Sequence, residues 1–380
     1  MEFEQLLRLM VERSASDLFI TAGIPPSLKV NGTVAPVDQT PLSPEVTRQM
    51  VLGSMSEHQR QEFAEKHECN YAISARGVGR FRVSAFYQRG MVGMVLRRIE
   101  MNIPTLEALR LPEVIRDISM AKRGLVLFVG ATGTGKSTSL AAMVGHRNRN
   151  SAGHIITIED PIEYLHQHRR CIVTQREVGL DTESFEVALK NTLRQAPDVI
   201  MIGEVRSRET MDYAVAFAET GHLCLTTLHA NNANQALDRI INFFPPDRHN
   251  QVWMDLSLNL RAIIAQQLIP TPDGQGRRAA IEVLLNTPLV ADLIRGGKVD
   301  ELKGLMMRST EQGMQTFDQA LYQLYASGEV SYEDALRYAD SANDLRLIIK
   351  LGPHALQDTL SRAEGLSLQP ETDPARPYGR

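Results

Sequence analysis

Apolar and polar positions alternate differently in the two halves of this chain. Before residue 100 the alternation is short and strand-like, as in residues 81–86, and residues 28–30 lead into the turn signal Asn31-Gly32. After Pro104 and Pro112 the pattern changes to near-continuous apolar runs separated by helical segments. These patterns predict a small α/β domain followed by a mostly parallel sheet, with the boundary near residue 100.

The second half predicts a doubly wound α/β core and a helical C-terminal part. Its buried strands are expected at residues 125–129, 155–158, 199–202 and 223–228. From Asn286 onward the pattern is helical, with Pro288 at a helix start and a capping sequence at residues 331–334. Residues 366–380 hold three prolines and few apolar side chains, which predicts disorder. The expected divisions are residues 1–100, a linker at 101–112, the core at 113–285, the helical part at 286–350 and a largely disordered tail at 351–380.

One motif carries most of the predicted chemistry. Directly behind residues 125–129 comes Gly130-Ala131-Thr132-Gly133-Thr134-Gly135-Lys136-Ser137, followed by a predicted helix at 138–147. In such a P-loop, backbone N–H groups surround phosphate oxygens, Lys136 reaches the β- and γ-phosphates, and Ser137 holds Mg²⁺. A chance match is the alternative, on the order of one in a hundred for a chain of this length. Gly130 to Ser137, together with Thr138, are therefore the predicted ligands of a nucleoside triphosphate.

Composition narrows the class of protein. The chain has 380 residues, is 43% hydrophobic and carries a formal charge of -4, which supports buried cores and disfavours a broad nucleic-acid-binding surface. Cys69, Cys171 and Cys224 are too scattered for a zinc ribbon or a disulfide framework. The N-terminus is acidic, and no apolar run approaches the roughly 18 residues of a membrane span. We expect a cytoplasmic protein that reaches a membrane only through partners.

Acidic residues follow two of the predicted strands. Asp160 and Glu163 come after residues 155–158, and Glu204 comes after residues 199–202. Ligands of open α/β sheets bind at the carboxyl ends of the strands, so these carboxylates are expected at the phosphate edge. Glu204 is the better candidate for the Mg²⁺ site, directly or through water, and Glu163 for the general base. Alternatively, Asp160 and Glu163 cap a helix that starts around Pro161.

Two histidines flank residues 223–228. His229 follows the carboxyl end of this strand, where it can sense the γ-phosphate, whereas His222 precedes the strand. A straight strand separates the two side chains by roughly 23 Å, so they cannot share one metal ion or one phosphate. We expect His222 to be a structural or subunit-contact residue.

Arginines of the first domain are candidates for a cationic finger. Arg80 and Arg82 lie two apart on one strand face, and Arg97 and Arg98 end the domain. P-loop ATPases often receive such a cation from a neighbouring subunit. Arginines on a strand more commonly just face solvent, and the spacing of these residues does not decide between that interpretation and a role as a cationic finger.

The order of these motifs resembles that of the secretion ATPases of type II/IV systems. The resemblance lies in the P-loop, the acidic box at 158–163, the strand end at 202–206 and the box at 220–229. Within that group, and over about residues 1–345, the chain is most similar to the pilus-retraction, twitching-motility ATPases of the PilT/PilU family. The motifs that carry this closer likeness are Ala15-Ser16-Asp17-Leu18, residues 79–83, Leu237-Asp238-Arg239-Ile240 and Met314-Gln315-Thr316.

The resemblance implies a fold, an assembly and site roles. It implies a PAS-like N-terminal domain, a RecA-like P-loop core with a helical appendage, and a homo-hexameric ring that binds ATP between the domains. The catalytic residues implied are Glu163 as base, Glu204 at Mg²⁺, His229 near the γ-phosphate, and Arg82 and Arg97 near the phosphates. The partners implied are a pilus platform protein of the inner membrane and a PilT-like paralogue, with no nucleic acid.

Details of the resemblance favour one branch of the family. Pilus-assembly and type II secretion relatives generally carry a four-cysteine zinc insert, which three scattered cysteines cannot supply, so retraction is favoured over assembly. Residues 289–296 depart from the family's helix sequence, and Phe19 replaces a usual His. With the longer tail, these departures resemble the accessory PilU branch and put autonomous retraction in doubt. The remaining alternatives are a pilus-assembly or type II secretion ATPase, a nucleic-acid translocase and a regulatory nucleotide-binding subunit.

Overall fold

The chain folds into two compact units. The structure is a computed structural model that describes residues 2–30, 32–99 and 102–352. Among these residues, one unit comprises those up to residue 105 and residues 148–196, and the other comprises residues 106–147 and 197–352. Asn31 of the predicted turn and residues 353–380 of the predicted tail lie outside the described residues.

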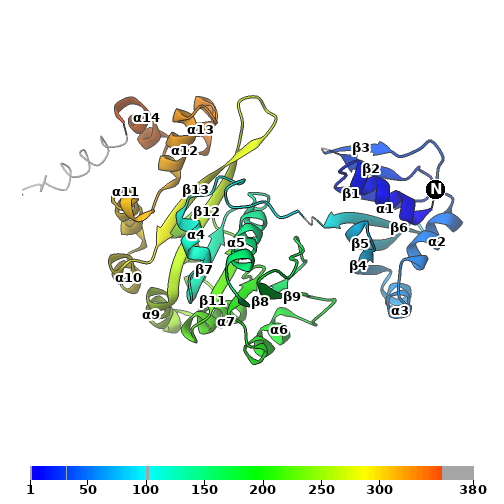
Figure 1. Cartoon of the computed structure of the whole chain (residues 1–380), viewed down its shortest axis with the longest axis horizontal. Coiled ribbons are helices and arrows are strands. Elements are labelled where there is room, and N and C mark those ends of the chain that lie inside the picture. Colours follow the sequence, from blue (N-terminus) through cyan, green and yellow to red (C-terminus); the bar gives the residue numbers. More distant parts are fainter. Residues whose placement is uncertain (1, 31, 100–101, 353–380) are drawn as a thin grey trace, which may run out of the picture. The chain divides into compact units, whose positions relative to one another are not determined.

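The first unit begins with a six-stranded antiparallel sheet (Figure 1). Its order is β3-β2-β1-β6-β5-β4, and helices α1, α2 and α3 pack against its strands. Alternate residues of β5, among them Phe81 and Val83, are buried, which confirms the strand predicted at residues 81–86. The elements are α1 Phe3–Glu12, β1 Asp17–Thr21, β2 Ser27–Val30, β3 Thr33–Pro36, α2 Pro44–Gly53, α3 Glu57–Lys66, β4 Glu68–Ala75, β5 Gly79–Gln88 and β6 Met91–Ile99.

The rest of the first unit is a parallel strand pair with one helix. β8 (Gly153–Glu159) pairs in parallel with β9 (Cys171–Glu177), and α6 (Phe185–Thr192) follows. His154 of β8 contacts two other parts of this unit, because its ring nitrogens lie 2.9 Å from the Gln195 carbonyl, just after α6, and 2.9 Å from Thr174 Oγ1 of β9. The strand predicted at residues 155–158 is confirmed.

The second unit is built on buried parallel strands. Its strands lie in the order β13-β12-β7-β11-β10. β7 (Gly124–Val129), β10 (Val199–Ile202) and β11 (Leu223–Leu228) are buried along their whole length, as the apolar runs predicted. β12 (Leu260–Pro270) runs parallel to β7, and β13 (Arg277–Leu285) returns antiparallel to β12 as a long hairpin (Figure 1). This hairpin was not among the predicted strands.

Helices cover the rest of the second unit. Residues 288–351 contain α10 to α14, with Pro288 in the first turn of α10 and Ser331 capping α13 by accepting the Asp334 N–H at 3.1 Å. None of the helices in the described ranges is both long and apolar enough to cross a membrane. The helices are α4 Val114–Ser119, α5 Lys136–Asn150, α7 Arg208–Glu219, α8 Ala233–Ile241, α9 His249–Asn259, α10 Pro288–Arg295, α11 Leu302–Arg308, α12 Phe317–Ala326, α13 Tyr332–Tyr338 and α14 Ala342–Leu351.

Candidate functional site

The P-loop joins the end of β7 to the start of α5. Gly135 has φ +85°, and a Cβ atom there would lie 2.7 Å from Gln266 Nε2. At Gly130 a Cβ atom would lie 2.6 Å from the Gln266 carbonyl oxygen. A side chain at Gly130 would push against the backbone of β12, and one at Gly135 would displace the Gln266 amide and adopt a strained backbone conformation, so both positions favour glycine.

Gln266 of β12 is hydrogen-bonded to the phosphate loop and to the start of α5. Its Nε2 donates to the Thr134 carbonyl at 2.8 Å, and its Oε1 accepts from the Ser139 hydroxyl at 2.7 Å. The Gln266 residue is only 3% exposed, so these bonds replace contacts with water that burial removes. One side chain therefore ties the loop and the first turns of α5 to the sheet. The sequence reading did not identify this residue.

Lys136 is buried and lacks a full counter-charge. Its Nζ donates to the carbonyls of Gly130 and Ala131, both at 2.8 Å. Burial lowers the pKa of Lys136, and the charge of Glu204 opposes that shift. An ammonium held by carbonyl oxygens at the N-terminus of a helix favours an anionic ligand, such as a phosphate chain.

Glu204 and His229 meet beside the phosphate loop, as predicted from the ends of their strands. His229 Nε2 lies 3.2 Å from Glu204 Oε2, and Arg206 bonds to the other carboxylate oxygen. Burial alone would raise the pKa of Glu204, but the Arg206 hydrogen bond and charge, together with His229, hold it below its ordinary value. Glu204 is therefore an ionised carboxylate at neutral pH.

Two hydrogen bonds between β11 and the segment that follows β10 bring this pair together. Thr227 donates from Oγ1 to the Gly203 carbonyl at 2.7 Å, and the Val205 N–H donates to the Thr227 carbonyl at 2.9 Å. His222 lies at the opposite end of β11, where its Nδ1 lies 3.2 Å from the Phe217 carbonyl at the end of α7. The two histidines are therefore at opposite ends of the strand, as predicted.

Glu163 belongs to the first unit, in the segment after β8. Residues 160–170 form no helix, so the alternative that Asp160 and Glu163 cap a helix start is wrong. The Glu163 side chain is exposed, and the Ile162 N–H next to it donates to the buried Glu177 carboxylate at 3.3 Å.

Glu159 is the carboxylate that the sequence reading left without a role. It is 7% exposed, and it accepts from Thr157 Oγ1 at 2.7 Å and from Gln175 Nε2 at 3.2 Å. Burial raises the pKa of Glu159 to about 7, against the effect of those two bonds. A carboxylate that titrates near neutral pH has a value suited to general base catalysis. Its position as the last residue of a buried strand was the signal in the sequence.

Arg82 and Arg97 are direct cross-strand partners on β5 and β6. Arg97 Nε lies 2.8 Å from Asp17 Oδ1, and the Asp17 side chain is only 6% exposed. Arg97 therefore has a structural ion pair within its own sheet. The contribution of either arginine to a site on another subunit stays a prediction.

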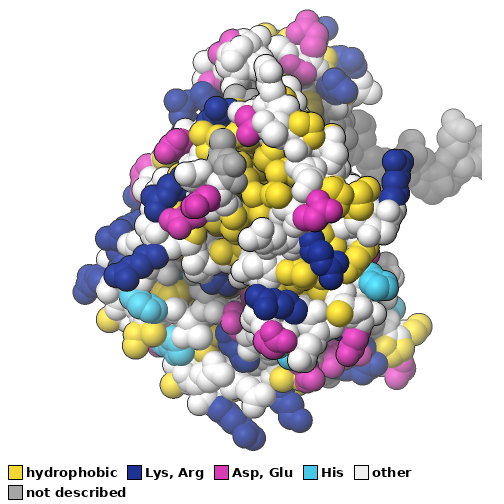
Figure 2. Space-filling model, turned by 90° about the vertical axis from the view of Figure 1, so that its right-hand side faces the viewer, with side chains coloured by type: hydrophobic (Ala, Val, Ile, Leu, Met, Phe, Trp, Pro, Cys, Tyr) yellow, Lys and Arg dark blue, Asp and Glu magenta, His cyan; other side chains and the backbone are white. Residues whose placement is uncertain are grey.

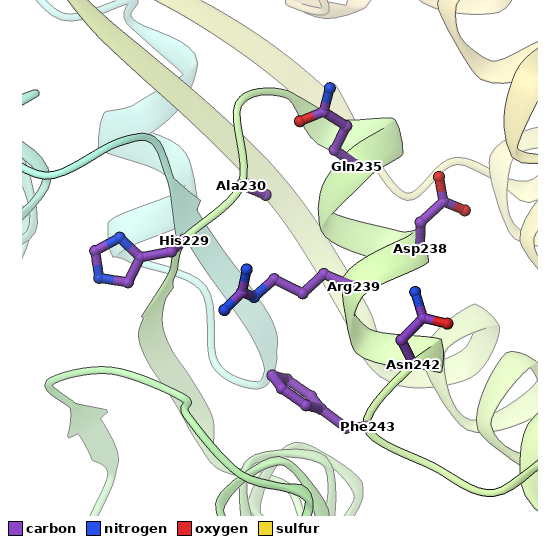
Figure 3. Close-up of a pocket in the computed structure, with 7 residues that line it drawn as sticks. All are labelled: His229, Ala230, Gln235, Asp238, Arg239, Asn242 and Phe243. Atoms are coloured by element: carbon purple, nitrogen blue, oxygen red, sulfur yellow. The ribbon is translucent and has the colours of Figure 1, made fainter.

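A cavity of ≈ 460 Å³ opens beside His229, and Arg239 reaches into it (Figure 3). The arginine extends from α8 toward the end of β11, and Gln235, Asp238 and Phe243 line the same cavity. Within residues 2–30, 32–99 and 102–352, the Arg239 side chain makes no hydrogen bond or ion pair. It is a free cation next to the predicted γ-phosphate histidine.

The oxygen donors of this unit fit a magnesium ion only in company with a phosphate. The Ser137 hydroxyl and the ionised Glu204 carboxylate are hard ligands of the kind Mg²⁺ takes. Among the residues that the structure describes, no group of three or more His, Cys, Asp or Glu side chains is placed to hold a metal. Mg²⁺ in nucleotide sites usually completes its shell with phosphate oxygens and water, so this donor set is sufficient for a nucleotide-bound ion.

Comparison with known proteins places the chain in a family. The family described as "Type II/IV secretion system protein" matches residues 4–337. "Type IV pilus ATPase PilU" of Pseudomonas aeruginosa is 78% identical over 377 residues, 99% of each chain. "Type IV pilus retractation ATPase PilT" of the same organism is 41% identical over 335 residues, 88% of this chain and 97% of the relative.

Solved structures give the same result. The crystal structure of the pilus retraction motor PilT with bound ADP is 41% identical, covers 91% of this chain and 99% of its own, and superposes with a TM-score of 0.86. The ATPase DotB of Legionella pneumophila is 27% identical over 88% of this chain, with a TM-score of 0.72. The chain with this phosphate loop and its Glu204–His229 pair therefore belongs to the type II/IV secretion system protein family.

Proposed function

We propose that this chain is an ATP-hydrolysing motor that powers retraction of a type IV pilus. The observation that carries the proposal is the joint presence, in one unit, of a P-loop held by Gln266 and an ionised Glu204 paired with His229. The chain is similar to pilus ATPases over nearly its whole length, which supports the proposal that the motor acts on a pilus.

The site residues divide the work of hydrolysis. The loop amides bind the phosphates, and Lys136 exchanges its two carbonyl partners for phosphate oxygens. Ser137 and Glu204 would hold Mg²⁺, which when bound screens the charge of the β- and γ-phosphates. His229, whose Nε2 lies 3.2 Å from Glu204, would sense the γ-phosphate. Glu163 is the proposed base that activates water, and the buried Glu159 is the second candidate for that role.

The finer architecture is part of the proposal. The N-terminal sheet is taken as the PAS-like domain, residues 113–285 as a RecA-like core, and residues 286–350 as a helical appendage. Six copies would form a ring, with Arg82 and Arg97 of one subunit near the phosphates bound by another. The ring would act in the cytoplasm on an inner-membrane platform protein, as an accessory to a PilT-like paralogue. The likeness to PilU supports this accessory role.

The experiment that tests the proposal counts surface pili and measures surface motility in cells that lack the chain. Cells are complemented with the wild-type chain, with Lys136→Ala, or with nothing. Failed retraction leaves many pili and little motility, and only the wild-type chain restores motility. A loss of pili in the deletion strain would instead identify an assembly ATPase. If the number of pili and the motility are both unchanged, the chain does not act on the pilus.

Nucleic acid is not favoured as the substrate of the motor. The net charge is -4, and Lys and Arg side chains lie among Asp and Glu side chains on the face seen in Figure 2. A translocase on DNA or RNA would bind it in a strongly salt-dependent way. Absence of such binding by the purified chain is the expected result.

A further inference from the structure

One buried carboxylate of the second unit has no part in the division of work described above. Glu282 lies in the middle of β13, is 3% exposed and pairs in register with Ala265 of β12. A glutamate is seldom buried unless polar groups surround it, because removing a charge from water is costly. The groups that bind the Glu282 carboxylate therefore indicate its role.

The Glu282 carboxylate binds the start of α8. The N–H of Ala233, the first residue of this helix, is buried and donates to Glu282 Oε1 at 2.8 Å. The Asn232 side chain caps the same turn by accepting the Gln235 N–H at 2.9 Å. A negative charge at the N-terminus of a helix is also favoured by the helix dipole. Burial raises the pKa of Glu282 to about 7, and the Ala233 bond is the largest influence that opposes this rise.

The same carboxylate also binds the start of α12. A hydrogen bond from the backbone of Phe317, the first residue of α12, favours the ionised form of Glu282 and lowers its pKa. The neighbours of Glu282 on β13 hold the segment before α12. Val283 and Gln315 exchange backbone hydrogen bonds at 2.8 and 3.2 Å, and Gln315 Nε2 donates to the Ile281 carbonyl at 2.7 Å. This part of β13 therefore joins the C-terminal helices to the start of α8.

α8 carries a cation into the cavity beside His229. Arg239 lies on the second turn of this helix and extends toward the end of β11 (Figure 3). Buried side chains such as Leu237 and Ile240 determine which face of α8 points outward. Its position along its own axis depends on the Ala233 bond, and a shift by one residue moves a helix by about 1.5 Å. A misplacement of about 1 Å can cost an enzyme about a hundredfold in rate, so this bond matters for catalysis.

We propose that Glu282 is a positioning residue for ATP hydrolysis, which holds the start of α8 so that Arg239 stays in the cavity beside His229. This role rests on the proposed function, because it assigns Glu282 to the same reaction. Of the described residues, those that line the cavity do not include Glu282, so its effect reaches the phosphate through Arg239. A movement of α12 would reach Arg239 by the same route.

The test measures kcat and KM of ATP hydrolysis by the purified full chain with Mg²⁺, together with the dissociation constant of ADP, at a pH above the pKa of Glu282. Glu282→Leu nearly keeps the size of the side chain but accepts no hydrogen bond. It should lower kcat about tenfold, the loss expected when Arg239 itself is removed, while KM and the dissociation constant of ADP stay within about twofold. Glu282→Gln keeps an acceptor oxygen and should restore kcat to within about threefold of the wild type.

Further variants show whether the effect passes through α8. In the double variant Glu282→Leu with Arg239→Ala the two losses should not multiply, because both remove the same cation from its place. Glu329→Ala is the matched control and should keep the wild-type kcat, since the Glu329 carboxylate binds Arg278 of the same strand instead of the start of α8. If Glu282→Leu does not give a folded chain in a thermal melt, Ala233→Pro removes the same bond from the other side and should show the same loss. Proline is accepted at the first position of a helix and lacks the N–H that Glu282 binds.

The outcomes separate this role of Glu282 from the proposed function. If the wild-type chain does not hydrolyse ATP, the proposed function itself fails. If the wild type hydrolyses ATP and the folded variant without the Ala233 bond keeps its kcat, the positioning role is overturned and the motor proposal stands. An equal loss of kcat and ADP affinity also overturns it, because Glu282 would then support the whole site. Losses that multiply in the double variant overturn it as well, because Glu282 would then act by a route other than Arg239.

Discussion

Replacing Gln266 with leucine should weaken nucleotide binding without unfolding the chain. The side chain is nearly the same size, so the packing of β12 is kept, but both polar contacts to the phosphate loop are lost. The Ser139 hydroxyl is buried at 1% exposure and loses its acceptor, while the half-buried Thr134 carbonyl loses its donor.

The size of the effect follows from where those groups lie. Leaving a buried hydroxyl without a partner costs about 1–3 kcal/mol, and the Thr134 carbonyl loses less because water can reach it. The P-loop conformation that binds phosphate is therefore disfavoured by about 2 kcal/mol, which raises the apparent dissociation constant of ADP by roughly 30-fold.

Calorimetric titration of ADP and a thermal melt of the same sample measure this prediction. Gln275→Leu is the matched control, because Gln275 is exposed in the turn of the same hairpin. The reasoning is refuted if folded Gln266→Leu binds ADP within about twofold of the wild type, or if Gln275→Leu weakens ADP by the same factor.

Three further predictions concern charges elsewhere in the chain. Burial raises the pKa of Glu282 to about 7 in the folded state, whereas in the unfolded state it stays near 4.5. Between these two pH values the folded state holds a proton that the unfolded state has released, so the free energy of unfolding falls as pH rises. Glu282→Gln should therefore match the wild type in urea unfolding near pH 5 and exceed it above pH 8, and a pH-independent difference would contradict this. Arg97→Ala leaves the buried Asp17 carboxylate unpaired and should lower the free energy of unfolding by about 1 kcal/mol, since the Arg97 side chain is 66% exposed. Arg82→Ala should change the free energy of unfolding little. Thermal melts in which Arg82→Ala is less stable than Arg97→Ala would contradict this prediction. Arg239→Ala should reduce the ATP turnover rate by at least about tenfold with little change in ADP affinity, and an unchanged rate would exclude a role near the γ-phosphate.

The sequence was most informative where local rules apply. The P-loop follows from its glycines, and the meeting of Glu204 with His229 follows from the shared carboxyl edge of parallel strands. Strands β7, β10 and β11 were visible because residues buried on both faces read as unbroken apolar runs.

The parts that were missed depend on non-local contacts. The Arg97–Asp17 pair joins residues 80 positions apart, and the register that sets Arg82 opposite Arg97 is fixed by the whole β5–β6 hairpin. The role of Gln266 depends on β12 lying next to β7, which no spacing rule gives. A glutamine pair inside an otherwise apolar run was the available signal for a buried polar contact.

The most direct test of the motor proposal is the steady-state rate of ATP hydrolysis by the purified full-length chain. We predict measurable turnover by the wild type that falls to background in Lys136→Ala and in Glu163→Gln, both of which should keep the wild-type melting temperature. Equal rates for the wild type and the folded Lys136→Ala chain would contradict the proposal that this phosphate loop drives a motor.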